Sequence, residues 1–296
     1  MVDSGPEGPS GVRDSGAADV LRDLEPASPG WLDFAAVDAL AADYRPGQAE
    51  RELQQRLDTG EVRDLTEMQK AGPGASSDVY KGKVVGDGAD HLVVYKPDSS
   101  HRSLRDDIPA EGLADREVAA ARTDDMLGYG LTQATVVWDG EGAHGRGSVQ
   151  SFVVDRQGGR PLYSYGETQT QRMAVFDYII GNTDRHRLNY LTGPGGILVG
   201  IDHALSFPET SAGYLRSMFI EKHFNQDLDP AVLAAARALD RVEFAAMLRA
   251  TGLSKEAVTG AVARLAEIQD NGRITGDAWD GMIVGRPRSI VREAKP

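Results

Sequence analysis

Three residues around a glycine-rich turn have the types and spacing that bind a divalent cation and a phosphate chain. Four residues separate Asp184 from Asn189, and Asp202 directly follows the apolar run 197–201. The turn at 193–196, Gly-Pro-Gly-Gly, joins two β-type runs and predicts a hairpin. Pairing about its centre would set Asn189 beside Asp202, with Asp184 in the preceding loop. Because carboxylate and amide oxygens are the ligands that hydrated Mg²⁺ prefers, the pattern predicts a magnesium-phosphate site.

The order of these residues is also that of the phosphoryl-transfer loop of protein kinases, where an Asp precedes a metal-binding Asn and a second metal-binding Asp follows. We therefore expect Asp184 to accept the proton of an attacking hydroxyl, and Asn189 and Asp202 to hold Mg²⁺, with Mn²⁺ as an alternative. Arg185 would offset the charge of Asp184 or reach the γ-phosphate. His186 would donate to a phosphate or pack within the loop. The alternative explanation is a turn that is rich in Asp and Asn for conformational reasons.

A family resemblance rests on these motifs. D-R-H-x-x-N at 184–189, followed by I-D at 201–202, resembles the catalytic core of phosphatidylinositol 3/4-kinase-type atypical kinases, and the layout is similar to HipA-type bacterial kinases and secretory-pathway kinases. A wider likeness, over about residues 57 to 275, is to an actinobacterial family of phosphatidylinositol-kinase-like proteins; it is carried by VYKP (94–97), REVAA (116–120), GSVQSFV (147–153), QRMAVFDYIIGNTDR (171–185) and GIDHALSF (200–207). His203-Ala204 stand where D-F-G has Phe-Gly, so the activation-loop logic of protein kinases is not carried over.

Lys96 closes an apolar run and is similar to the kinase lysine that pairs with the α- and β-phosphates. Its expected partner is Glu117, on a helix predicted over 113–127 and ended by Gly128. Glu111 is a rival partner nearer the preceding loop, but the REVAA likeness favours Glu117. The alternative for Lys96 is a surface lysine at the end of a strand.

Two further segments are expected to contact the nucleotide. A turn between predicted strands contains Gly74, Ser76 and Ser77, and such a turn lets backbone N–H groups approach phosphate oxygens, although an ordinary hairpin turn is the alternative. The resemblance implies that the run 149–154 is a hinge between lobes. Backbone groups around Gln150 and Phe152 would then bind the adenine edge.

The surrounding elements predict an α+β fold of the two-lobed protein-kinase-like (atypical kinase) kind, with a small β-rich N-lobe and a mostly helical C-lobe. The expected divisions are a disordered lead (1–30), a helical extension that packs on the core or presents a partner surface (31–57), the N-lobe (58–154), the C-lobe (155–281) and a basic tail (282–296). Apolar residues at helical spacing predict one buried helix face late in the chain, at Val258, Val262, Leu265 and Ile268.

Composition limits the function classes. The absence of cysteine excludes disulfides and thiolate metal sites and favours a cytoplasmic protein. The net charge of −13 argues against nucleic acid and against stable association with an anionic membrane, since both are held through basic patches. No run approaches the roughly 20 apolar residues of a bilayer span, and residues 1–16 lack the basic and apolar regions of a secretory signal.

The sequence therefore predicts an ATP- and Mg²⁺-dependent phosphotransferase. It would transfer the γ-phosphoryl group to a hydroxyl of an unidentified acceptor, either a protein serine or threonine or a small molecule. The alternatives are a kinase-like nucleotide-binding module that acts through interactions with partners, and a related enzyme that transfers an adenylyl group.

Overall fold

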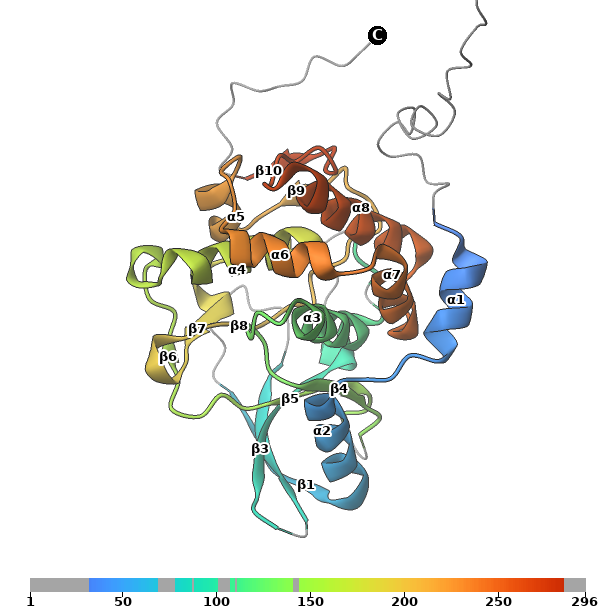
Figure 1. Ribbon diagram of the computed structural model, residues 1–296. Coiled ribbons are helices and arrows are strands. Elements are labelled where there is room, and N and C mark those ends of the chain that lie inside the picture. The colour runs from blue at the N-terminus through green and yellow to red at the C-terminus, as the bar shows by residue number, and fades with distance from the viewer. Residues whose placement is uncertain are drawn as a thin grey trace, which may run out of the picture. The chain divides into compact units, whose positions relative to one another are not determined.

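The computed structural model describes residues 32–68, 78–86, 88–100, 107–109, 111–140 and 144–284, and the fold is given for these (Figure 1). The predicted lead, the turn with Gly74, Ser76 and Ser77, and the tail from residue 285 lie outside them. The α-helices are α1 (Phe34–Ala42), α2 (Gln48–Thr59), α3 (Leu113–Leu127), α4 (Glu167–Ile180), α5 (Met218–His223), α6 (Pro230–Ala238), α7 (Arg241–Ala250) and α8 (Lys255–Asn271). The strands are β1 (Glu61–Glu67), β2 (Tyr80–Val85), β3 (His91–Pro97), β4 (Thr135–Trp138), β5 (Gly147–Ser151), β6 (Gln157–Gly158), β7 (Tyr190–Thr192), β8 (Leu198–Gly200), β9 (Tyr214–Leu215) and β10 (Met282–Ile283). These elements form an α+β fold.

Five strands from the first half of the chain form an antiparallel sheet in the order β1-β2-β3-β5-β4. Side chains alternate between its faces, as strand geometry requires. One face is apolar and buried, and α2 packs against it through Leu53 and Leu57. Figure 1 shows α2 lying along this sheet. The other face of β3 carries Val94 and Lys96.

A second hydrophobic cluster lies among the helices. The apolar residues of α4 between Met173 and Ile180 are fully buried, and α4 packs against α5 and α8. The predicted buried face of α8 is confirmed, since all four of its apolar residues are fully buried: Val258, Val262, Leu265 and Ile268.

The predicted N-terminal helices pack on the rest of the protein. Helix α1 lies against α7, with Val37 buried in the helical cluster and Asp38 accepting a hydrogen bond of 2.8 Å from Arg249 Nε. Helix α2 is joined to α3 by Arg122, whose Nε and NH2 lie 3.0 and 2.7 Å from the carboxylate of Glu50. Both helices therefore pack on the rest of the protein, as one of the two predicted alternatives has it.

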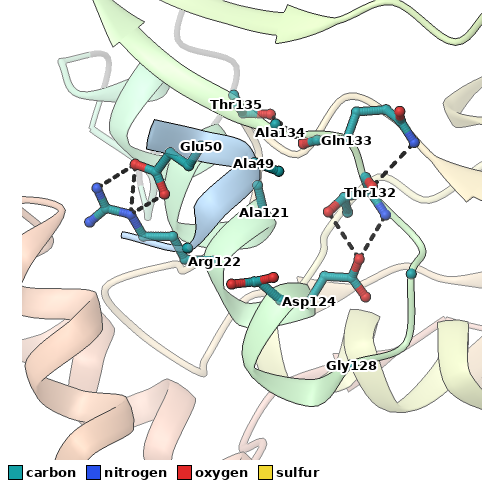
Figure 2. A pocket seen from close by; sticks show the side chains of 13 residues that line it. Ala49, Glu50, Ala121, Arg122, Asp124, Gly128, Thr132, Gln133, Ala134 and Thr135 are labelled. Atoms are coloured by element: carbon teal, nitrogen blue, oxygen red, sulfur yellow. Dashed lines mark hydrogen bonds and ion pairs between the residues drawn. The ribbon is translucent and has the colours of Figure 1, made fainter. Parts of the chain in front are cut away.

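A hollow of about 300 Å³ lies between the start of α2 and the end of α3 (Figure 2). The carboxylate of Asp124 fixes its wall, because Oδ2 accepts hydrogen bonds from the backbone N–H groups of Leu131 and Thr132 at 2.7 and 2.8 Å. None of the residues proposed from the sequence as catalytic or metal-binding lines it.

The hairpin predicted around the turn 193–196 is present as β7 and β8, but its register differs from the prediction. Tyr190 pairs with Gly200, so the N–H of Ile201 donates to the carbonyl of Asn189 at 3.1 Å. The turn closes around Gly195, with the N–H of residue 193 bonded to the carbonyl of residue 197. Asn189 therefore stands opposite Ile201, and Asp202 lies one residue beyond the predicted pairing.

Measured against the length and apolar character that a bilayer span requires, none of the helices in the described ranges qualifies.

Candidate active site

The loop that carries Asp184 begins where α4 ends. Gly181 adopts a left-handed backbone (φ 62°), which turns the chain out of the helix. The side chain of Asn182 then bridges the turn, because its Nδ2 donates to Asp177 and its Oδ1 accepts from the N–H of Asp184 at 2.9 Å. Local hydrogen bonds therefore fix the backbone of Asp184 immediately after the helix.

A fully buried ion pair between Asp177 and Arg185 anchors this loop. Arg185 Nε donates to Asp177 Oδ1 at 3.0 Å, and NH1 donates to the carbonyls of Asn189 and Ile201 at 2.5 and 2.6 Å. Ser217, the N-cap of α5, also donates to Asp177, at 2.7 Å. The guanidinium of Arg185 therefore contacts α4, the loop and the hairpin at once.

This burial corrects one of the roles predicted for Arg185. Its side chain has no exposed surface, so it does not reach a phosphate. Its charge helps to lower the pKa of the Asp184 carboxyl, although burial, His186, Arg216 and Asp202 act on that carboxyl more strongly. Arg185 is a positioning residue in this structure.

Asp184 is partly exposed and lies between the side chains of His186 and Arg216. His186 Nε2 is 3.5 Å from its Oδ2, and Arg216 NH1 is 3.3 Å from its Oδ1. Burial raises the pKa of the Asp184 carboxyl, His186 and Arg216 oppose the increase, and Asp202 adds to it. A carboxylate with a raised pKa is a better proton acceptor, which suits the role of a general base.

His186 also shapes the loop. Its Nδ1 accepts a hydrogen bond from the N–H of Leu188 at 3.2 Å and so begins the short 3₁₀ turn Arg187–Asn189. His186 therefore caps the turn within the loop, and its second nitrogen faces Asp184.

Asn189 is nearly buried at the end of that 3₁₀ turn. Its Nδ2 donates to the carbonyl of Asp184 at 2.9 Å. This bond fixes the amide by its nitrogen, and Oδ1 is the atom with which an amide binds a cation.

Asp202 follows β8 with a left-handed backbone (φ 61°), and 47% of its side-chain surface is exposed. Its Oδ1 lies 3.0 Å from Lys96 Nζ, and the same amino group donates to Glu117 Oε1 at 2.6 Å. The predicted pair of Lys96 with Glu117 is present. Lys96 thus joins the sheet, α3 and the hairpin.

Charge balance keeps this cluster ionised. Burial would lower the pKa of Lys96, but Asp202 and Glu117 outweigh burial and raise it. Burial likewise favours protonation of Glu117, but Lys96 and His203 outweigh that effect and hold its pKa well below the usual range. The lysine therefore stays positively charged and the glutamate negatively charged.

His203 and Asp177 have no role in the predicted site, but the structure places both in direct support of it. His203 is buried, and its Nδ1 lies 3.2 Å from Glu117 Oε2. Because an ionised carboxylate only accepts hydrogen bonds, this ring nitrogen carries the proton. The available signal for Asp177 was its position among apolar residues of a helix, since a buried carboxylate requires a partner.

The backbone groups predicted to bind adenine are used within the sheet. Gln150 lies in β5, which is bordered by β3 and β4, and its side-chain nitrogen donates to Thr135 Oγ1 at 3.1 Å. The N–H of Phe152 donates to the carbonyl of Leu92 at 2.9 Å. Phe152 therefore cannot offer its N–H to a base, which removes that one donor from the predicted contact with adenine.

The donor set suits a cation that is bound together with a nucleotide. Among the described residues no group of three or more His, Asp or Glu side chains is placed to hold a metal. Mg²⁺ does not need one, because it keeps several waters and takes one or two protein ligands plus substrate phosphates. Asn189 and Asp202 are two residues with oxygen donors, which is the number and kind of protein ligand that Mg²⁺ takes beside a nucleotide.

Two comparisons with known proteins bear on this site. Residues 146–214 match the family model described as phosphatidylinositol 3- and 4-kinase, and this stretch contains Asp184, Asn189 and Asp202. The chain is also 32% identical over 149 residues to Protein Rv2133c of Mycobacterium tuberculosis, an alignment that covers 38% of this chain and 52% of the relative. These matches support a phosphatidylinositol 3/4-kinase-like family. They also support kinase-like phosphotransfer as the general function, and the α+β fold is compatible with it. The chain spans about half the length of this curated relative.

Proposed function

We propose that this chain is a cytoplasmic, ATP- and Mg²⁺-dependent kinase of the two-lobed, atypical type, which phosphorylates a protein serine or threonine or a hydroxyl of a small molecule. The observation that carries the proposal is the contact of Lys96 Nζ with both Glu117 and Asp202. A lysine held between these two carboxylates lies where a phosphate chain and its cation would be bound together.

Each residue has a defined part in the proposed reaction. Lys96 binds the α- and β-phosphates, and Glu117, itself held by His203, keeps the amino group in place. Asn189 and Asp202 hold the cation, which when bound neutralises negative charge on the phosphates.

Asp184 orients the acceptor hydroxyl and takes its proton. The hydroxyl oxygen forms a bond to the γ-phosphorus while the bond from that phosphorus to the bridging oxygen breaks, so that ADP leaves. In this proposal the β-sheet with α2 and α3 forms the N-lobe and the later helices form the C-lobe.

The direct test is incubation of the purified chain with ATP labelled at the γ-phosphate, first alone and then with lysate of the host. We expect label to appear on the chain or on an acceptor, to disappear with EDTA and to return with excess Mg²⁺ or Mn²⁺. Intact-mass analysis of the product separates phosphoryl from adenylyl transfer. Label transfer that is unaffected by EDTA, or an adenylyl product, would contradict the proposal.

Replacement of Lys96 by Met is expected to weaken binding of the Mg²⁺-nucleotide on the order of tenfold to a hundredfold, because charge-assisted hydrogen bonds to the phosphates are lost. Titration with a non-hydrolysable ATP analogue measures this, with circular dichroism to verify folding. Lys222→Met is the matched control, since Lys222 also pairs with a glutamate, Glu167, at 2.7 Å but lies in α5. Equal affinities of the Lys96→Met and parent proteins would remove Lys96 from the nucleotide site.

A further inference from the structure

Two cationic side chains that have no part in the proposed reaction contact one aromatic ring. Lys81 Nζ lies 4.4 Å from the centroid of the Phe152 ring, and Arg156 Cζ lies 4.5 Å from it. Lys81 comes from β2, whereas Phe152 and Arg156 follow β5. We call these three residues the base-side cluster.

Neither cation of this cluster forms an ion pair with a carboxylate in the described part of the chain, and only burial acts on the pKa of Arg156, which it lowers. Lys83, two residues along β2 from Lys81, is a contrast, because its amino group lies 3.0 and 3.1 Å from Asp64 and Asp90. In a chain with a net charge of −13, two cations without carboxylate partners indicate a site for an external electronegative group.

The strand register puts the base-side cluster on the sheet face that carries Lys96. Lys81 pairs with Val94, which is two residues from Lys96 and therefore shares its face. Phe152 lies opposite Leu92, one step beyond the last pair of the β3–β5 ladder. Leu92 is four residues from Lys96 along β3, which corresponds to roughly 13 Å of strand. A nucleotide whose phosphates lie at Lys96 would extend its base along this face toward Phe152.

The chemistry of the cluster favours one edge of a purine. Lysine and arginine side chains only donate hydrogen bonds. Guanine presents two acceptors, O6 and N7, on one edge, whereas adenine presents a donor at N6 beside its N7. Phe152 supplies a face for stacking, and its backbone N–H is already bonded to Leu92.

We propose that the nucleotide base packs beside Phe152 with its acceptor edge toward Lys81 and Arg156, so that guanine nucleotides bind at least as tightly as adenine nucleotides. This inference rests on the proposed function, because it takes Lys96 as the phosphate end of the same site. The incoming base displaces a cation from the Phe152 ring, a contact that is weak at an exposed position. That cation then donates to the base.

The test compares Mg²⁺ complexes of non-hydrolysable GTP and ATP analogues by calorimetric titration of the whole chain. We expect the GTP analogue to bind with equal or higher affinity. Arg156→Met and Lys81→Met should each weaken the GTP analogue at least about fivefold, the lower limit of the discrimination given by paired donors, and change the ATP analogue less. Phe152→Leu should weaken both analogues alike. Lys83→Met is the matched control and should change neither.

The outcomes separate this inference from the proposed function. Tighter binding of the ATP analogue to the parent protein, or an affinity ratio that Arg156→Met and Lys81→Met leave unchanged, overturns the inference and leaves the kinase proposal standing. Failure of both analogues to bind the folded parent protein overturns both. A loss of GTP preference in the Lys83→Met protein equal to that in Arg156→Met would also contradict the inference, because the effect would then be one of net charge.

Discussion

Replacement of Asp202 by Asn is expected to lower the rate of phosphoryl transfer by about a hundredfold to a thousandfold, the scale on which loss of one group that stabilises transition-state charge acts. Asn has nearly the shape of Asp and tolerates the left-handed backbone at this position (φ 61°), so the chain path is kept. The lost charge weakens cation binding and removes one of the two carboxylates beside Lys96. Initial rates over a range of Mg²⁺ concentrations should show a lower maximum and a higher Mg²⁺ requirement.

Asp64→Asn is the control for this experiment. Asp64 also has a left-handed backbone (φ 56°) but lies in β1, with 70% of its side chain exposed. Its replacement should leave the rate and the Mg²⁺ requirement unchanged. Asp184→Asn should also lower the rate, because the proton acceptor is lost, with a smaller change in the Mg²⁺ requirement. Parent rates in both the Asp202→Asn and Asp184→Asn proteins would show that these residues are not the catalytic set.

Replacement of Asp177 by Ala is expected to lower the free energy of unfolding by about 3–5 kcal/mol, because it leaves the guanidinium of Arg185 buried without its carboxylate. Ser217 also loses its hydrogen-bond acceptor. Urea denaturation followed by circular dichroism measures the change. Activity should fall as well, since Arg185 holds the backbone of Asn189 and Ile201.

Two variants separate burial from charge in this prediction. Asp270→Ala removes the partner of Arg241 from a pair that is largely exposed, and it should cost less than about 1 kcal/mol. The double variant Asp177→Ala/Arg185→Met removes both buried charges and should recover part of the lost stability. If Asp177→Ala were as stable as Asp270→Ala, the buried pair would not anchor the loop.

The parts of the site that the sequence predicts are those fixed by local rules. The helix expected over 113–127 is α3 with the same bounds, because Gly128 takes the left-handed conformation that ends it. The pair of Lys96 with Glu117 could be predicted because the kinase resemblance specifies both positions, a lysine at the end of a strand and a glutamate on the next helix. Asp184, Asn189 and Asp202 lie within one loop and hairpin, so short-range geometry brings them together.

The parts that the sequence does not predict depend on distant residues or on fine turn geometry. His203 is 86 residues from Glu117, and only the folded chain shows that the two meet. From the sequence, Arg185 is a candidate catalytic cation. Its buried ion pair with Asp177, which makes it a positioning residue, is visible only in the structure. The hairpin register depends on which residue the turn closes around, and the composition of the turn does not specify that.

The packing of α1 on α7 has a consequence for synthesis of the chain. Asp38 and Arg249 are 211 residues apart, so α1 leaves the ribosome well before its partner helix exists. At translation rates of about 5–20 residues per second, the interval is roughly 10 to 40 seconds. Throughout that interval the buried side of α1 around Val37 lacks the α7 residues against which it packs in the folded protein, so it is exposed to solvent on the nascent chain.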